Sequence, residues 1–322
     1  MKYYVGIDLG GTNIAAGIVD SQYNIIEVAK TKTNMPRPAT EIAADMSRVA
    51  LDAIAKAGLD KNDVEWIGIG SPGLINRDLG IVEYSNNLGF NNVPLAKLVQ
   101  DDTGIKTYID NDANVAAYGE FVAGSAKGTN NAIIITLGTG VGAGIIIDGN
   151  LYSGSNFGGA EIGHMVIEID GYDCTCGRKG CFEVYSSATG LVRMTRESMD
   201  KHPDSSMWAI SREYGKVSAR TAIEAMRAGD KAGKMVVDRY IKHLACGIAN
   251  TINIFQPEIL CIGGGVCNEG DALLNPLLEI IGHEVYTRES GRNTRIEIAS
   301  LGNNAGIIGA ALLGTAIKRN QH

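Results

Sequence analysis

The residues best suited to chemistry lie close together, in the stretch 158–183, GGAEIGHMVIEIDGYDCTCGRKGCFE. Three cysteines in the pattern Cys-x-Cys-x4-Cys and one upstream histidine could bind a metal ion: His164, Cys174, Cys176 and Cys181. Gly177 and Gly180 permit the tight turns that would bring the sulfur atoms to one point. Three thiolates and one imidazole form a closed zinc shell without an open position for a catalytic water. The pattern predicts a structural zinc site, and the alternative is a group of unrelated buried thiols.

Two carboxylates flank these residues. Glu161 lies one helical turn before His164, and Glu183 follows just after the last cysteine. A metal-bound imidazole can still donate a hydrogen bond from its other nitrogen, and the metal fixes its tautomer. Glu161, His164 and Glu183 are therefore predicted to bind the hydroxyl groups of a polyol.

The start of the chain predicts a strand over 2–7, a glycine-rich turn, and two more strands over 14–19 and 25–31. The turn contains five residues that suit a nucleotide: Asp8, Gly10, Gly11, Thr12 and Asn13. Its backbone N–H groups can approach phosphate oxygens closely, and Asp8 could hold Mg²⁺ through water. An ordinary Gly-Gly hairpin with a capping Asp would look the same. No Walker sequence occurs and no helix follows, which argues against a P-loop or a dinucleotide site.

The pattern of strand, glycine-rich turn and strand occurs a second time in the chain. Residues 136–148, TLGTGVGAGIIID, align without gaps on residues 8–20, DLGGTNIAAGIVD, with five identities. Both windows predict strand, glycine-rich turn, strand. A duplicated domain would produce two such hairpins on opposite sides of one nucleotide. The second turn, Gly138, Thr139 and Gly140, is therefore predicted to contact the terminal phosphates.

Polar or glycine-rich residues also follow other predicted strands. The strand over 64–70 stops at Ser71-Pro72-Gly73, and the strand over 258–262 ends in Gly263, Gly264 and Gly265. The strand over 106–109 leads into Asp110-Asn111-Asp112 and a helix over 113–121. Helix capping is the ordinary role of Asn111 or Asp112, but strand ends in α/β chains also bind ligands.

Residues 86–90 and 93–95 are predicted to be loops. Further helices are expected over 39–57, 95–102, 218–227, 231–255, 273–285 and 305–318.

These motifs resemble the ROK family of sugar kinases and sugar-responsive repressors, and its bacterial glucokinase branch in particular. The family pattern G-x-x-G-E-x-G-H followed by C-x-C-G-x-x-G-C-x-E is matched at Glu161, Gly163, His164, Cys174, Cys176, Gly177, Gly180, Cys181 and Glu183. The chain departs from it in reading Gly158-Gly159-Ala160-Glu161, where the glycines are shifted from the positions of the pattern, so either glycine could be the first. The resemblance covers nearly the whole chain.

The resemblance implies an α/β, two-lobed actin/hexokinase-like (ribonuclease H-like) ATPase fold, duplicated. The small lobe is expected over 1–115 plus 305–322 and the larger lobe, with the zinc loop, over 116–304. The implied reaction is ATP-dependent phosphorylation of the 6-hydroxyl of an aldohexose held between the lobes. Glucose is the most favoured substrate. Asp112 would be the base, Gly73, Asn111 and Asp112 would contact sugar, and Gly263, Gly264 and Gly265 would hold adenosine. ATP, Mg²⁺ and structural Zn²⁺ are the expected cofactors.

Composition narrows the class of protein. The chain has 322 residues, a net charge of -7 and no basic run, which argues against nucleic acid and anionic membranes as partners. The start lacks an apolar signal core, and the uncharged run over 132–147 is shorter than the roughly 20 residues of a membrane span, so a cytoplasmic protein is expected. A homodimer or higher homo-oligomer is expected.

Three alternatives stay open at this point. An N-acetylmannosamine kinase or a fructokinase would use similar sugar contacts. A sugar-sensing repressor would carry a DNA-binding helix-turn-helix ahead of the first hairpin, whereas this hairpin begins at residue 2. A non-catalytic actin-like nucleotide switch is the third alternative. The presence of Asp112 together with Glu161, His164 and Glu183 argues against it, because a switch without catalysis does not need this set of residues.

Overall fold

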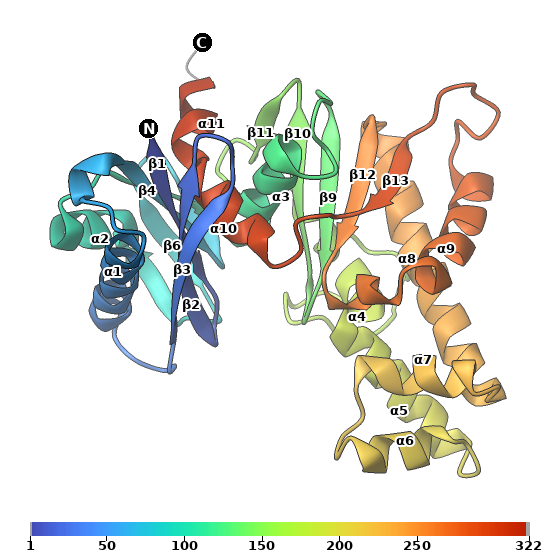
Figure 1. Ribbon diagram of the computed structural model, residues 1–322. Helices are drawn as coiled ribbons and strands as arrows, with labels where there is room; N and C mark the ends of the chain where they lie inside the picture. The colour runs from blue at the N-terminus through green and yellow to red at the C-terminus, as the bar shows by residue number, and fades with distance from the viewer. Residues whose placement is uncertain (1, 320–322) are drawn as a thin grey trace. The chain divides into compact units, whose positions relative to one another are not determined.

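The computed structural model describes residues 2–319 and has a mixed α/β fold (Figure 1). The first sheet has the strand order β3-β2-β1-β4-β8. Its strands are β1 (Tyr3–Leu9), β2 (Asn13–Asp20), β3 (Ile25–Lys32), β4 (Val64–Ser71) and β8 (Thr107–Asn111). The strands β1, β4 and β8 run parallel, so their carboxyl ends meet at one edge of the sheet. That edge carries Asp8, Ser71 and Asn111.

The second sheet repeats this arrangement, with the strand order β11-β10-β9-β12-β13. Its strands are β9 (Ala132–Leu137), β10 (Val141–Ile147), β11 (Asn150–Tyr152), β12 (Ile259–Gly263) and β13 (Arg295–Ile298). β2–β3 and β10–β11 are antiparallel, and β4–β8 and β12–β13 are parallel. The predicted duplication is therefore confirmed in the strand order, and the two glycine-rich turns stand at corresponding places.

Helices cover the first sheet. Helices α1 (Ala39–Lys56) and α2 (Leu95–Thr103) pack together against it, and α10 (Asn304–Ala311) packs on β1 and β4 (Figure 1). Gly6 pairs with both Gly17 and Gly68, which makes a row of three glycines across the sheet. A Cβ on Gly68 would lie 1.8 Å from the Ala310 carbonyl oxygen. The missing side chains thus let the backbone of α10 lie directly on the sheet. Beside it, α3 (Asp112–Ala123) packs on α10.

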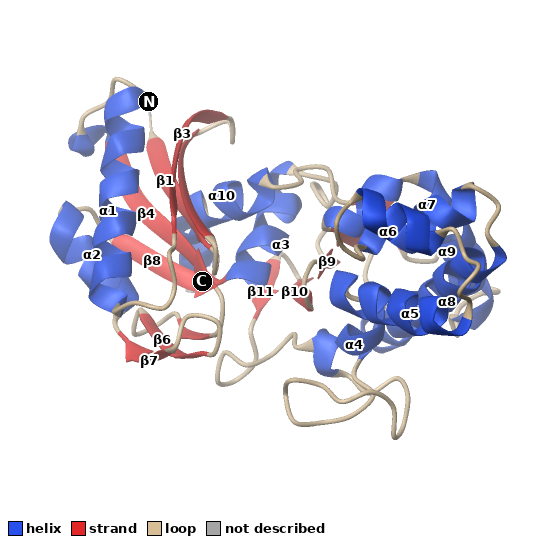
Figure 2. Ribbon diagram, turned by 90° about the horizontal axis from the view of Figure 1, so that it is seen from below, coloured by secondary structure: helices blue, strands red, loops and turns tan. Residues whose placement is uncertain are grey.

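The helices of the second half pack together, most of them on α8, while α6 packs on α5 and α7 (Figure 2). They are α4 (Phe182–Ser186), α5 (Ala188–Lys201), α6 (Met207–Glu213), α7 (Ala219–Arg227), α8 (Lys231–Phe255) and α9 (Asp271–Glu284). The predicted ranges for α7, α8 and α9 agree with these within a few residues. Within residues 2–319, no helix combines the length and the apolar character that crossing a bilayer would need.

Two predictions from the sequence are wrong in detail. The segments read as loops contribute to a third, three-stranded sheet of β5 (Leu74–Asn76), β6 (Ile81–Ser85) and β7 (Phe90–Val93). Strands this short carry too few residues for a visible alternation. The final helix is divided at Leu312 into α10 and α11 (Leu313–Arg319). The Leu312 N–H bonds to two carbonyls, of Ile308 and Gly309, which tightens the turn there.

Contacts between residues divide the chain into two compact units. Unit 1 is Met1–Ile134, Ala143–Ala160 and Ala299–His322, and unit 2 is Ile135–Gly142 and Glu161–Ile298. The lobes expected from the sequence, 1–115 plus 305–322 and 116–304, stay a prediction. Met1 and residues 320–322, which the expected small lobe includes, lie outside the described residues.

Candidate active site and metal centre

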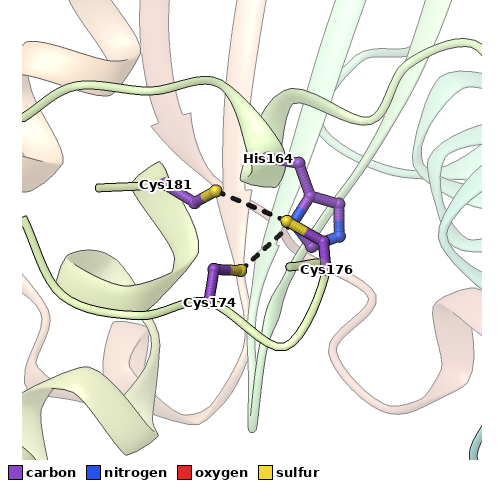
Figure 3. A group of neighbouring side chains, drawn as sticks. All are labelled: His164, Cys174, Cys176 and Cys181. Atoms are coloured by element: carbon purple, nitrogen blue, oxygen red, sulfur yellow. Dashed lines mark hydrogen bonds between the residues drawn. The ribbon is translucent and has the colours of Figure 1, made fainter. Parts of the chain in front are cut away.

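The predicted metal ligands come together in unit 2 (Figure 3). The ligand atoms of His164, Cys174, Cys176 and Cys181 all lie within 4.8 Å of one another. The Cys174 Sγ is 3.6 Å from His164 Nδ1, and the Cys176 Sγ is 3.7 Å from the Cys181 Sγ. A tetrahedral zinc ion with ligand bonds near 2.3 Å places its ligand atoms about 3.7 Å apart. The cluster therefore has the size of a zinc shell.

Local backbone structure forms this loop. The 173–180 segment closes on itself through a bridge between Asp173 and Lys179 and a 2.8 Å hydrogen bond from the Cys174 N–H to the Arg178 carbonyl. Gly180 has φ +73°, and a Cβ there would lie 1.6 Å from the Glu168 carbonyl oxygen, so this turn admits only glycine. Metal binding at these thiols requires their deprotonation. Burial and the neighbouring thiols raise the pKa of Cys181 to about 12, and a divalent cation would favour its thiolate.

Three predicted sugar ligands adjoin the cluster in unit 2. His164 ends a short 3-10 turn, Ile162–His164, that follows directly from Glu161. Its Nδ1 edge faces the Cys174 sulfur, so Nε2 lies on the opposite edge of the ring. The Glu183 carboxylate lies 4.0 Å from the Cys174 Sγ through Oε1. The imidazole can thus serve the cluster with one nitrogen and a substrate hydroxyl with the other.

The remaining predicted sugar ligands lie in unit 1, at the start of α3. The Asn111 Oδ1 accepts from the Ala113 and Asn114 N–H groups at 2.9 and 3.3 Å, so the ordinary capping role is present. The Asn111 Nδ2 also donates to the Gly73 carbonyl at 3.1 Å. Gly73 has φ +119°, and a Cβ there would lie 2.3 Å from the Tyr84 carbonyl oxygen. The structure therefore brings Asn111 and Gly73 together.

Asp110 supports this site, although the sequence assigned it no role. The buried Asp110 carboxylate accepts from the Asn114 amide at 3.0 Å and from the Asn111 N–H at 2.7 Å, and Arg77 Nη1 lies 3.5 Å away. Burial raises the pKa of Asp110, and its hydrogen bonds and the Arg77 charge act against that rise. Asp110 thus anchors the end of β8. Three polar residues in a row at a strand end were the only signal for it in the sequence.

Asp8 and Asp112 place two carboxylates near one another in unit 1. Burial raises the pKa of Asp112, while the Ala113 N–H bond at 2.9 Å lowers it. Burial, and then the charge of Asp112, raise the pKa of Asp8 from 3.8 to about 6. Two partly desolvated carboxylates within electrostatic reach favour a shared cation or a shared proton.

The Asp8 carboxylate is expected to destabilise the free protein. The folded protein holds the Asp8 proton up to about pH 6 and the unfolded chain releases it near 3.8, so stability falls as pH rises through that window. Asp8→Asn should therefore raise the Tm at pH 7.5. The corresponding gain in the free energy of unfolding should be no more than about 3 kcal/mol. The gain should vanish toward pH 4. Thermal denaturation of both proteins from pH 4 to 8 without nucleotide or Mg²⁺ checks this; a gain independent of pH would contradict it.

The first glycine-rich turn joins β1 to β2 in unit 1. The Gly10 N–H donates to the Asn13 carbonyl at 2.9 Å, and the Thr33 hydroxyl donates to the Gly10 carbonyl at 2.7 Å. Gly11, Thr12 and Asn13 are exposed, and nothing lies within 4 Å of where a Gly11 Cβ would stand. The turn therefore offers backbone N–H groups and side chains on an open surface.

The second turn joins β9 to β10. The Gly138 N–H donates to the Gly140 carbonyl at 3.0 Å, and the Gly138 carbonyl accepts from the Ala188 N–H at 2.9 Å. The Thr189 hydroxyl donates to the Thr139 carbonyl at 2.8 Å. The start of α5 thus supports this turn. A Cβ on Gly138 would meet nothing within 4 Å, whereas one on Gly140 would lie 2.3 Å from the Glu183 Oε2.

The glycines after β12 differ from one another. Gly264 has φ +99°, and a Cβ there would lie 2.1 Å from the Leu137 carbonyl oxygen, so this glycine allows β12 to approach β9. Gly265 is open and begins a 3-10 turn, Gly265–Glu269. A mainly apolar pocket adjoins that turn and is lined by Leu191, Ile223, Met226, Val237, Tyr240, Val266, Glu269, Ala272 and Leu273. The sequence did not reveal it, because apolar residues on α7 and α8 look like ordinary core.

Known proteins are similar to this chain in sequence and in fold. The model of the ROK family matches residues 4–317. This chain belongs to the ROK family. The glucokinase of Halalkalibacterium halodurans is 35% identical over 97% of this chain and 94% of that protein. The crystal structure of a ROK family glucokinase from Streptomyces griseus, in complex with glucose and AMPPNP, has 32% identity and a TM-score of 0.83 over 97% of this chain and 98% of that one. A xylose repressor of Caldicellulosiruptor bescii is 28% identical over 95% of this ROK chain and 76% of the repressor.

Proposed function

We propose that this ROK protein is a hexose kinase that transfers the terminal phosphoryl group of ATP to the 6-hydroxyl of glucose. The observation that carries the proposal is the half-buried Asp112 carboxylate, with its raised pKa, beside Asn111 at the end of a parallel strand. The similarity to glucokinases over nearly the full chain favours glucose over N-acetylmannosamine or fructose. It also favours an enzyme over a repressor or a nucleotide switch.

Each proposed sugar ligand has a group that suits a hydroxyl. In unit 1, Asn111 binds a sugar hydroxyl and Gly73 contacts the sugar. In unit 2, Glu161, His164 and Glu183 bind further hydroxyls. Asp112 accepts the proton of the 6-hydroxyl while that oxygen bonds to the terminal phosphorus and the bond to the leaving ADP oxygen breaks. A carboxylate suits this role because it needs only to lie within about 3 Å of the hydroxyl.

The proposed nucleotide ligands come from three turns. Gly10, Gly11, Thr12 and Asn13, and on the other hairpin Gly138, Thr139 and Gly140, contact the phosphates through N–H groups and hydroxyls. Asp8 would hold Mg²⁺, which would supply positive charge beside the transferred group. Gly263, Gly264 and Gly265 adjoin adenosine, because glycines at a strand end let a flat ring lie close to the backbone.

Structural Zn²⁺ is the proposed occupant of the cluster of His164, Cys174, Cys176 and Cys181. Its four-ligand set and its spacing support zinc rather than Mg²⁺, which prefers oxygen ligands. We place the protein in the cytoplasm, where ATP is available and thiols stay reduced. A homodimer or larger homo-oligomer is the expected assembly.

A coupled kinase assay tests the proposed function. Purified protein should form ADP with glucose, and the assay should compare glucose with mannose, fructose, N-acetylmannosamine and N-acetylglucosamine. The highest kcat/KM is expected for glucose. Preference for N-acetylmannosamine or fructose would reassign the substrate, and absence of sugar-dependent ADP formation would reject the kinase.

A valine in place of Gly138 is expected to weaken ATP binding selectively. A Cβ at this position meets nothing in the free protein, so the fold should tolerate the change, and the added methyl groups would occupy space proposed for phosphate oxygens. The KM for ATP should rise about 10-fold or more, which corresponds to about 1.4 kcal/mol. The KM for glucose and the Tm should change little. Equal increases in both KM values would contradict a phosphate role for this turn.

A further inference from the structure

Glu183 makes a contact that a sugar ligand does not need. Its Oε2 accepts the Val141 N–H at 3.0 Å, at the first residue of β10. The two residues are 42 positions apart in the chain. Hydrogen bonds to a charged carboxylate are roughly twice as strong as neutral ones. The carboxylate therefore holds the end of the Gly138–Gly140 turn.

Gly140 supports this assignment. Its φ lies outside the left-handed region, so its backbone conformation does not require glycine. A Cβ at Gly140 would lie 2.3 Å from the Glu183 Oε2. The absence of a side chain at Gly140 thus makes room for the carboxylate.

The same carboxylate is connected to the metal cluster through one short helix. Cys181 is the N-cap of α4, and Glu183 lies two residues later in that helix. The Phe182 N–H donates to the Met165 carbonyl at 2.7 Å, and the Phe182 ring is fully buried, so the residue between them is held in place. A displacement of the Cys181 backbone has a direct path to Glu183 along this helix.

We propose that Glu183 is a positioning residue that holds the Gly138–Gly140 turn in its phosphate-binding shape and makes that shape depend on metal in the cluster. The inference rests on the proposed function of the turn as a phosphate site. It is compatible with a sugar contact, because one carboxylate offers about four acceptor positions. Its new consequence is that the metal affects nucleotide binding even without sugar.

Hydrogen exchange at the Val141 amide tests the positioning directly. Glu183→Ala removes the acceptor, and exchange at Val141 should become at least about 10-fold faster, which corresponds to about 1.4 kcal/mol. Glu183→Gln keeps an acceptor oxygen and should restore most of the protection. Removing the metal from wild-type protein with a chelator should also speed exchange, and added Zn²⁺ should reverse this. In Glu183→Ala the chelator should have no further effect at Val141.

Nucleotide affinity measured without sugar provides the second measurement. The Kd for an ATP analogue should rise about 10-fold in Glu183→Ala. Asn111→Ser is the matched control, because serine keeps the helix cap but loses a proposed sugar contact in unit 1. It should weaken glucose binding and leave nucleotide affinity unchanged, so loss of a sugar contact alone would not explain the Glu183 result.

The outcomes separate this inference from the proposed function. Unchanged exchange at Val141, either in Glu183→Ala or after metal removal, would overturn it even if the protein is a kinase. Faster exchange with unchanged nucleotide affinity would uphold the positioning role and reject the turn as a phosphate site. If Glu183→Ala does not fold, Gly140→Ala gives the same test, since its methyl group must displace the carboxylate. That variant should also exchange faster at Val141, and wild-type exchange would overturn the inference.

Discussion

Asp112→Asn is expected to lower kcat for glucose phosphorylation by about 10² to 10⁴, the usual effect of removing a general base. Asparagine keeps the size of the side chain and an oxygen that can accept the Ala113 N–H bond. It cannot accept the proton of the 6-hydroxyl. The Kd for glucose should therefore stay close to wild type while turnover is lost, and the Tm should not fall, because asparagine removes a carboxylate whose charged form is disfavoured by burial. Retention of more than about a tenth of the wild-type kcat would mean that Asp112 is not the base.

The pH profile provides a check that a structural role would not affect. Burial raises the pKa of Asp112, so its base form is lost at a higher pH than for an exposed aspartate. The wild-type kcat should decline as pH falls through that raised pKa. The residual activity of Asp112→Asn should lack this decline. Asp110→Asn is the matched control, because it removes a neighbouring buried carboxylate that supports β8 and should preserve the wild-type pH profile.

Features encoded by local patterns could be predicted from the sequence. The apolar period of α1 and α8, the two glycine-rich hairpins and the Cys-x-Cys-x4-Cys spacing each lie within a few tens of residues. Such patterns constrain the backbone by themselves, through helix periodicity, turn chemistry and metal-ligand spacing. The strand order of the two sheets then extends a modest repeat of five identities to two complete five-stranded sheets.

Contacts between segments that are far apart in the chain could not be predicted, because they leave no local pattern in the sequence. The row of Gly6, Gly17 and Gly68 accepts α10, and the buried Glu120 accepts the Leu301 N–H at 2.7 Å, 181 residues away. The sequence around each glycine predicts only a turn or an ordinary strand position. The sequence around Glu120 predicts only an exposed position on a helix. Their roles follow from packing between elements, which no single stretch of sequence encodes. The bond from the Val141 N–H to Glu183 is of the same kind.

Cys176→Ala is expected to abolish zinc binding by purified protein, from about one zinc per chain to none, and to raise the KM for glucose by about 10- to 100-fold. Cys176 is exposed, so its loss should cost little packing, and the effect should come from the missing ligand. Elemental analysis and steady-state kinetics measure the two effects. Cys246→Ala, which removes a thiol outside the cluster, should keep its zinc and its wild-type KM.

The size of the effect on ATP distinguishes two views of the cluster. The Gly138–Gly140 turn lies more than thirty residues before Cys174, so its place in the sequence suggests independence from the metal. The structure joins them through Glu183, whose Oε1 lies 4.0 Å from the Cys174 sulfur and whose Oε2 accepts the Val141 N–H. The KM for ATP should therefore rise in Cys176→Ala together with that for glucose. Wild-type protein without metal after purification free of chelators, or a Cys176→Ala enzyme with an unchanged KM for glucose, would separate this loop from substrate binding.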